Sequence, residues 1–329
     1  KKFTDHMAHM RWTREGGWED RGVIPYGPLE LTPGASVFHY CQSVFEGIKA
    51  YKRKDGSVWT FRPGYNAARL NHSARRLALP ELSREDFVAS LVDYVRADAK
   101  WVPEVDGSSL YLRPFMFASE EFVGVHPAGV VDYYVIGSPS GPYFKGGLSG
   151  VAIWVEREYH RAGPGGTGSA KAGGNYAASL LPQIQAEAKG FSQVCFLDTY
   201  EGKYLEELGG MNMFVVMADG TIRTPELTGV ILEGGTRSAI LRLLRDEGVD
   251  VREEKIALSE VVDGIRSGAV AEVFACGTAA VVTPITRLGG DDFDVEIEVG
   301  DKTREIHKRL TDIQWGRAED PYGWTYRLV

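Results

Sequence analysis

The chain has 329 residues, of which 43% are hydrophobic and 25% charged, and its 37 Lys and Arg residues against 45 Asp and Glu residues give a net charge of −8. A chain of this length favours two domains over one. No stretch approaches the run of about eighteen apolar residues that a membrane-spanning helix needs, so a membrane protein is excluded. The basic residues are scattered rather than gathered in a stripe, which argues against nucleic acid as a partner.

The three cysteines, Cys41, Cys195 and Cys276, are too few and too widely spaced for a disulfide framework or a zinc ribbon. The N-terminal residues show no apolar signal-peptide core, so a reducing, cytoplasmic location is expected. Because the first residue is Lys rather than Met, removal of a presequence stays open. His6 and His9 lie three residues apart without a third ligand, and no metal site is predicted.

Strands are predicted over residues 34–62, where Val37, His39 and Cys41 alternate with Phe38 and Tyr40, and Asp55-Gly56 marks a hairpin turn. Apolar residues at helical spacing predict a helix from Ala67 to Leu79, and Ser83 with Asp86 predicts the cap of a second helix. Further strands are expected at 110–117 and 130–136.

A stretch rich in Gly, Ser and Pro follows, and it predicts a linker at 138–150 between a smaller domain, 1–137, and a larger one, 151–329. The second half is predicted to hold strands at 151–155, 194–197, 249–252 and 270–275, helices at 176–189, 236–244 and 258–265, a hairpin at Asp219-Gly220 and a last helix burying Ile306, Leu310 and Ile313. Hairpins are as frequent as strand–helix–strand units, which predicts a mixed α and β (α+β) class rather than a purely parallel sheet.

Six glycines lie between Gly163 and Gly174 around a single lysine, Lys171. A Walker phosphate loop has Lys directly after Gly and a hydroxyl directly after Lys, and this segment has Ala on both sides of Lys171. Small neighbours leave room for a planar ligand, and a desolvated lysine can form a Schiff base with an aldehyde cofactor. A solvated loop lysine is the alternative, which this segment alone does not exclude.

Pyridoxal phosphate would also need an acid at its ring nitrogen and an anion site for its phosphate. Glu207 is followed by two glycines that would let a flat ligand approach, whereas its neighbour Glu206 is expected to be an ordinary solvated loop residue. A glycine turn opens a helix at Thr236, where backbone N–H groups suit a phosphate, although Thr236 could equally be a helix cap. Thr278 follows an apolar strand.

Four motifs, in this order, resemble those of the branched-chain amino acid aminotransferases, which are fold-type IV pyridoxal phosphate enzymes. The motifs are GTGSAKAGGNY with Lys171, ELGGMN with Glu207, EGGTR with Thr236 and FACGTA with Thr278. The likeness extends upstream through 44–51, 66–70 and 110–114, and therefore covers nearly the whole chain.

The resemblance implies a two-domain fold-type IV architecture with the cofactor between the domains. It makes Lys171 the Schiff-base lysine, Glu207 the partner of the pyridine nitrogen and Tyr176 the hydroxyl near the phenolic oxygen. The other implied roles are phosphate binding by Arg69, Gly235, Thr236 and Thr278, ring packing by Leu232, binding of the substrate α-carboxylate by the amides of Thr278 and Ala279, and a substrate pocket of Tyr40, Phe45, Tyr111 and Tyr143 with Arg113 near its entrance.

The implied activity is amino-group transfer between leucine, isoleucine or valine and 2-oxoglutarate by a homodimer, in which a loop near Val123-Gly124-Val125 reaches the partner subunit's site. Two departures from the family pattern are notable: Gly235 replaces the usual β-branched residue, and Ala280 and Thr283 replace the redox cysteine pair of mitochondrial relatives. The alternatives are a D-amino acid aminotransferase or aminodeoxychorismate lyase of the same fold, and a non-catalytic phosphate-binding module.

Overall fold

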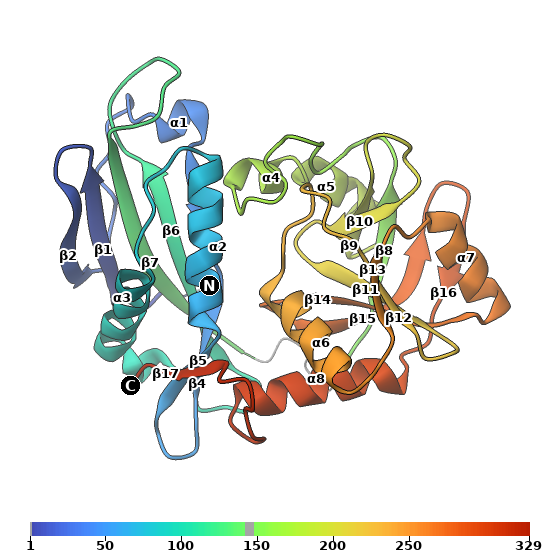
Figure 1. Cartoon of the computed structure of the whole chain (residues 1–329). Helices are drawn as coiled ribbons and strands as arrows, with labels where there is room; N and C mark the ends of the chain where they lie inside the picture. The colour runs from blue at the N-terminus through green and yellow to red at the C-terminus, as the bar shows by residue number, and fades with distance from the viewer. Residues whose placement is uncertain (1, 142–147) are drawn as a thin grey trace. The chain divides into compact units, whose positions relative to one another are not determined.

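A computed structural model describes residues 2–141 and 148–329 of the chain (Figure 1). The chain divides into two compact units, one comprising Lys1–Tyr143, Ala170–Gly173 and Asp312–Val329, and the other Phe144–Ser169 and Gly174–Thr311. The domain boundary predicted from the sequence stays a prediction, and two segments that it assigns to the second domain, 170–173 and 312–329, lie in the first unit. Backbone pairing accounts for both, because Ala172 bridges to Val44 and residues 325–327 pair with residues 59–61.

An antiparallel sheet of eight strands forms the centre of the first unit, in the order β17-β5-β4-β6-β7-β1-β2 with β3 paired to β6. The strands are β1 His6–Thr13, β2 Gly17–Pro25, β3 Ser43–Phe45, β4 Ile48–Lys52, β5 Val58–Phe61, β6 Ser109–Ala118, β7 Val130–Ser140 and β17 Thr325–Arg327. The helices are α1 Val37–Tyr40, α2 Pro63–Arg76 and α3 Arg84–Ala97, with a short 3-10 helix at Ala99–Trp101. Leu70, Leu91 and Leu112 are fully buried in the core that these elements share.

The strand predicted over 37–41 is wrong, because Val37–Tyr40 forms the short helix α1. The amides of Tyr40 and Cys41 donate to the carbonyls of Ser36 and Val37, at 2.9 and 3.1 Å, and Cys41 ends the helix in the left-handed region with φ 53°. Five residues of alternating character do not distinguish a strand from one helical turn whose side chains are partly exposed.

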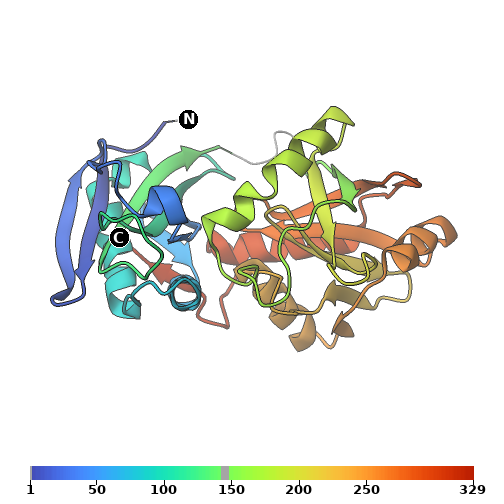
Figure 2. The same ribbon diagram turned by 90° about the horizontal axis from the view of Figure 1, so that it is seen from above.

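A mixed sheet of nine strands forms the second unit, in the order β10-β9-β8-β15-β14-β11-β12-β13 with β16 paired to β15 (Figure 2). The strands are β8 Val151–Glu156, β9 Gln193–Leu197, β10 Leu205–Leu208, β11 Asn212–Met217, β12 Ile222–Pro225, β13 Val251–Glu254, β14 Val270–Gly277, β15 Val281–Gly289 and β16 Asp294–Glu296. Strand β8 is parallel to β9 and β15, and β12 is parallel to β13. The remaining pairs are antiparallel, so the predicted mixed class is confirmed.

The helices of the second half are α4 Gly173–Ala177, α5 Leu180–Ala188, α6 Gly235–Asp246, α7 Leu258–Ser267 and α8 Asp301–Gln314. The single helix predicted at 176–189 is therefore two helices. The hydroxyl of Ser179 donates to the carbonyl of Tyr176 at 2.7 Å, and Pro182 lacks an N–H, so the helical ladder is interrupted there. Within the described residues, no helix has both the length and the apolar character required to span a bilayer.

The cap predicted at Ser83 is confirmed and allows a stability test. The Ser83 Oγ atom accepts the Asp86 amide at 3.0 Å and donates to the Asp86 carboxylate at 2.7 Å. Ser83→Ala removes both bonds, so we expect a loss of about 1 kcal/mol in the free energy of unfolding. Urea titration measures the free energy of unfolding, and hydrogen exchange of the Asp86 amide reports the loss of the cap bond. Ser83→Thr, which keeps a hydroxyl able to make both bonds, is the control, and an Ala variant as stable as this control would contradict the cap.

Candidate active site

The backbone around Lys171 is fixed on the first unit. The Lys171 amide donates to the Ser73 hydroxyl on α2 at 2.8 Å, and the Lys171 carbonyl accepts the Phe45 amide at 3.0 Å. Ala172 forms an antiparallel bridge with Val44, which is fully buried. The backbone at Lys171 and Ala172 therefore pairs with β3, and it is held in place at Lys171 rather than lying in a flexible loop.

The Phe45 ring lies beside both the amine of Lys171 and the guanidinium of Arg113. The Lys171 Nζ atom lies 5.1 Å from the centroid of the Phe45 ring, and the Arg113 guanidinium lies 4.6 Å from the same ring. Arg113 also donates to the Tyr111 hydroxyl at 3.0 Å. A Cβ atom at Gly47 would overlap that hydroxyl, so Gly47 leaves the space in which it lies. The structure thus brings four predicted residues together: Phe45, Tyr111, Arg113 and Lys171.

The other predicted residues of the first unit lie in different surroundings. The ring of Tyr40 stacks on Phe122 with 6.1 Å between centroids and is 37% exposed. Tyr143 lies outside the described residues. The Arg69 guanidinium donates to both carboxylate oxygens of Glu46, at 2.8 and 2.7 Å, and the Asn66 side chain donates to the same carboxylate at 2.8 Å. Sequence reasoning assigned no role to Glu46, which is fully buried and fixes the orientation of Arg69.

Glu207 is the centre of a second group of side chains, on the second unit. Its carboxylate is buried, accepts a hydrogen bond from the Leu232 amide at 2.8 Å, and forms an ion pair with Arg161 at 2.8 Å. The Arg161 guanidinium lies 5.8 Å from the centroid of the Tyr176 ring. Sequence reasoning missed Arg161, whose only signal is its position just before the glycine-rich segment. Three predicted residues, Glu207, Leu232 and Tyr176, therefore contact this one arginine or its partner.

Thr167 and Asn175, which sequence reasoning did not single out, bond to each other across the segment that carries Lys171. The Thr167 hydroxyl donates to the Asn175 side-chain oxygen at 2.7 Å, and the Asn175 amide group donates to the Thr167 carbonyl at 2.7 Å. Asn175 is buried, so this reciprocal pair satisfies polar groups that would otherwise be costly.

The N-terminus of α6 has the form expected of an anion site. Gly234 is the N-cap and has no side chain with which to cap the helix, and Thr236 is a helical residue rather than a cap. The Asn212 side chain donates to the Leu232 carbonyl at 3.0 Å, and a Cβ atom at Gly234 would overlap the Asn212 side-chain oxygen. This close packing holds the helix start beside Leu232. The amides of a helical first turn have no intrahelical partner, which suits a phosphate.

Thr278 and Ala279 form the turn between β14 and β15. Asn212 pairs with Cys276 and Gly277 pairs with Val281, so this turn lies at the end of the central strands where β11 begins. Val281 has φ 63°, a left-handed conformation that is rare for a β-branched residue. The turn thus places two predicted backbone donors near the strand that holds Asn212.

The electrostatics of β10 differ for its two acids. Glu206 is half-buried in the strand rather than solvated in a loop, and burial, with the charges of Asp198 and Glu207, raises the pKa of Glu206 to about 7, while Arg161 opposes the shift. The register of β10 against β9 shifts between Leu205 and Leu208, so strict alternation does not hold there, and Glu206 is half-buried whereas Glu207 is buried. Burial also raises the pKa of Cys195 and Cys276 to about 12, which makes both thiols poor nucleophiles.

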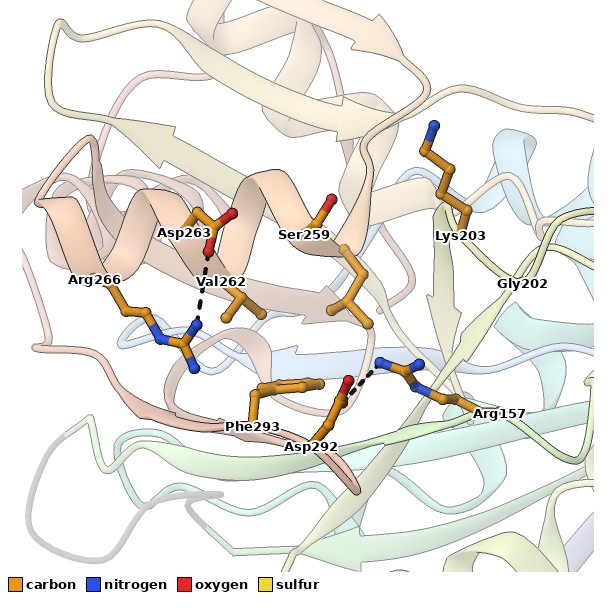
Figure 3. A pocket seen from close by; sticks show the side chains of 10 residues that line it. Arg157, Gly202, Lys203, Ser259, Val262, Asp263, Arg266, Asp292 and Phe293 are labelled. Atoms are coloured by element: carbon orange, nitrogen blue, oxygen red, sulfur yellow. Dashed lines mark hydrogen bonds and ion pairs between the residues drawn. The ribbon is translucent and has the colours of Figure 1, made fainter.

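A pocket of about 310 Å³ on the second unit is lined by residues that belong to neither of the two groups of side chains described above (Figure 3). Arg157 and Asp292 form an ion pair at 2.9 Å in its wall, and Arg266 and Asp263 form another at 3.7 Å. Among the residues that the structure describes, none of the predicted site residues lines this pocket. In the part of the chain that the structure describes, no cluster of His, Cys, Asp or Glu is suited to a metal ion.

The fold and these two groups of side chains define a class of protein, the class IV amino-transferases, and the chain belongs to this family: residues 43–288 match its family model. Over its whole length the chain is 49% identical to the branched-chain-amino-acid aminotransferase of Mycolicibacterium smegmatis, of which it covers 91%. It superposes on the branched-chain amino acid aminotransferase of Escherichia coli with a TM-score of 0.81 and 28% identity, over 99% of this chain and 100% of the other. A solved aminotransferase of the same name, from T. th., with pyridoxamine 5'-phosphate, has a TM-score of 0.79 and 26% identity over 98% and 99% of the two chains.

Two glycines of the lysine segment provide a matched test of close packing. A Cβ atom at Gly168 would overlap the Val230 backbone carbonyl, whereas a Cβ atom at Gly174 would have nothing within 4 Å. We expect Gly168→Ala to lower the thermal midpoint of the cofactor-free protein by several degrees, because backbone must move to relieve the overlap. Gly174→Ala should leave it nearly unchanged. Differential scanning fluorimetry measures both, and equal midpoints would refute the packing argument.

Proposed function

We propose that this chain is a branched-chain-amino-acid aminotransferase that uses pyridoxal phosphate, with leucine, isoleucine or valine and 2-oxoglutarate as substrates. The observation that carries the proposal is the placement of Lys171, whose backbone is anchored on β3 and whose amine lies beside the Phe45 ring. The names of the relatives found for the whole chain support the same activity. The position of this amine favours an enzyme over a phosphate-binding module, which would not need it.

The chemistry of the available donors fits pyridoxal phosphate. A buried, ion-paired carboxylate at Glu207 suits a protonated pyridine nitrogen, and the helix start at Gly235 and Thr236 suits a phosphate. We assign Thr278 and Arg69 to the same phosphate, the Tyr176 hydroxyl to the phenolic oxygen, and Leu232 to the ring face. When bound, this cofactor supplies an electron-withdrawing ring that makes the substrate α-proton acidic.

Lys171 performs the proton transfer in this proposal. With the cofactor bound, its Nζ atom would hold the cofactor aldehyde, and as a free amine the same atom would take the proton from the substrate α-carbon and hold it for return. The bonds from Ser73 and Phe45 hold the lysine backbone still while its long side chain moves. Catalysis needs this combination, because the same nitrogen must be reached by the substrate and return to a fixed position.

The substrate side chain is assigned to the rings of Phe45 and Tyr111, with Tyr40 and Tyr143 completing the pocket as the resemblance implies. Ring faces suit an aliphatic side chain. The Arg113 guanidinium, which lies against Phe45 and Tyr111, provides the cation that the carboxylate of glutamate or 2-oxoglutarate needs. The amides of Thr278 and Ala279 are assigned to the substrate α-carboxylate.

Replacement of Lys171 tests the mechanism. We expect Lys171→Ala to bind pyridoxal phosphate without the visible band of the wild type, and to lose amino-group transfer from L-leucine by about a thousandfold or more. Single-turnover spectra with L-leucine, without a keto acid, measure this. Lys189→Ala is the control, because Lys189 also lies against an aromatic ring, that of Trp154. Unchanged turnover in Lys171→Ala would refute the mechanism, and a wild-type band changed only by a D-amino acid would identify the D-amino acid aminotransferase instead.

We further propose a homodimer in the cytoplasm. Val123 and Val125 are 83% and 90% exposed, which supports the assignment of their loop to a partner subunit, and the three free cysteines fit a reducing compartment. Val123→Lys combined with Val125→Lys should convert the dimer to a monomer, as measured by light scattering after size exclusion. Val105→Lys, at a position 64% exposed, is the control. A wild-type monomer would overturn the assembly proposed here.

A further inference from the structure

Arg161 is among the most buried charged side chains of the second unit. Its side chain is 2% exposed, and its partner Glu207 is 4% exposed. A buried guanidinium is costly unless its charge and its N–H groups are satisfied. The pairing with Glu207 at 2.8 Å satisfies the charge.

The same Arg161 nitrogen that lies nearest to Glu207 also donates to two backbone carbonyls. These are the carbonyl of Gly168, at 3.1 Å, and that of Val230, at 3.2 Å. Gly168 lies three residues before Lys171 in the sequence. Val230 lies two residues before Leu232, whose amide donates to the Glu207 carboxylate. One guanidinium group thus connects the lysine segment, the segment before α6 and the carboxylate.

The close approach of these segments depends on the arginine. A Cβ atom at Gly168 would overlap the Val230 carbonyl, so the two backbones are nearly in contact. Two carbonyl dipoles pointing into one buried place repel each other unless a donor lies between them. Arg161 supplies that donor, and it brings the positive charge that an ionised, buried carboxylate requires.

We propose that Arg161 is a positioning residue that keeps Glu207 ionised and correctly oriented for the pyridine nitrogen. This inference rests on the role proposed above for Glu207. Without the guanidinium, a buried carboxylate takes up a proton more readily, and a neutral acid no longer stabilises a protonated ring nitrogen. Arg161 therefore sets the lowest pH at which the cofactor can act as an electron sink.

Other titratable groups lie near this carboxylate and must be separated from it. Glu206 is its neighbour on β10, and the charge of Asp198 contributes to the raised pKa of Glu206. Cys195, on β9, pairs with Leu208 of β10, and the Tyr176 ring lies beside Arg161. Of these, Glu206 titrates in the working range, at a pKa of about 7. Glu206→Gln therefore identifies any part of a pH profile that belongs to Glu206.

The experiment measures the pH dependence of the single-turnover rate with L-leucine, together with the affinity for pyridoxal 5'-phosphate added to cofactor-free protein. In Arg161→Met we expect the acid limb of the rate profile to move to higher pH by about one unit or more, and cofactor affinity to fall about tenfold or more. Arg161→Lys, which keeps the charge, should restore part of both. A merely structural arginine would lower the rate without moving the limb.

Two further variants decide the route by which Arg161 acts. If it acts through Glu207, replacing Arg161 by Met in a Glu207→Gln background should change cofactor affinity by less than about twofold, and additive losses would overturn the proposal. Arg223→Met is the control for general destabilisation, because Arg223 pairs with Glu254 at 2.5 Å and with Glu260 at 3.4 Å in the same unit, and neither acid is a predicted site residue. An unmoved acid limb in both Arg161 variants refutes the inference. Failure of the wild type to react with L-leucine would instead refute the proposed function.

Discussion

Neutralisation of buried charge is the constraint on which both groups of candidate side chains depend. On the first unit, fully buried Glu46 binds Arg69, and on the second unit, Glu207 pairs with Arg161. In each pair, one partner is assigned to the cofactor and the other holds it in place. Breaking such a pair costs more than the intact pair contributes, because the surviving charge stays buried without a counter-ion. The orientation of the groups that we assign to the cofactor is therefore set by folding itself, before any ligand binds.

Backbone contacts fix what the ion pairs do not reach. Lys171 needs a mobile side chain, so its position is secured through its amide and carbonyl, and Thr167 and Asn175 close the segment around it. Glycine at 168 permits an approach to Val230 that any side chain would prevent. The entropy lost by ordering a glycine-rich segment is offset by these bonds, which explains how a flexible composition yields a fixed geometry.

Local signals in the sequence predicted the elements that follow simple periodicity. The Ser83 cap, helices α2, α3, α6 and α7 and the mixed sheet class are confirmed, because each depends on residues within one or two turns. The strand β1 was not predicted, since its register shifts between His9 and Met10 and the alternation is lost. Arg161 was missed for a different reason: its partner Glu207 is 46 positions further along the chain, and only the fold brings them together. The motifs identified the family, whereas the residues that hold the motifs in place required the structure.

The side chains that we assign to the substrate on the first unit combine two aromatic rings with one cation, a combination that would suit both an aliphatic and an acidic substrate. The Arg113 guanidinium lies against the rings of Phe45 and Tyr111, at 4.6 and 5.4 Å from their centroids. Its Nε atom is buried without a hydrogen-bond partner among the described residues. Contact with ring faces stabilises a guanidinium without fully replacing water, so the cation persists beside an apolar surface. In the proposed assignment, an aliphatic side chain would occupy the ring faces, and a substrate carboxylate would gain a charge-assisted bond that leucine does not make. Packing would then select one substrate and charge the other, within the same few residues.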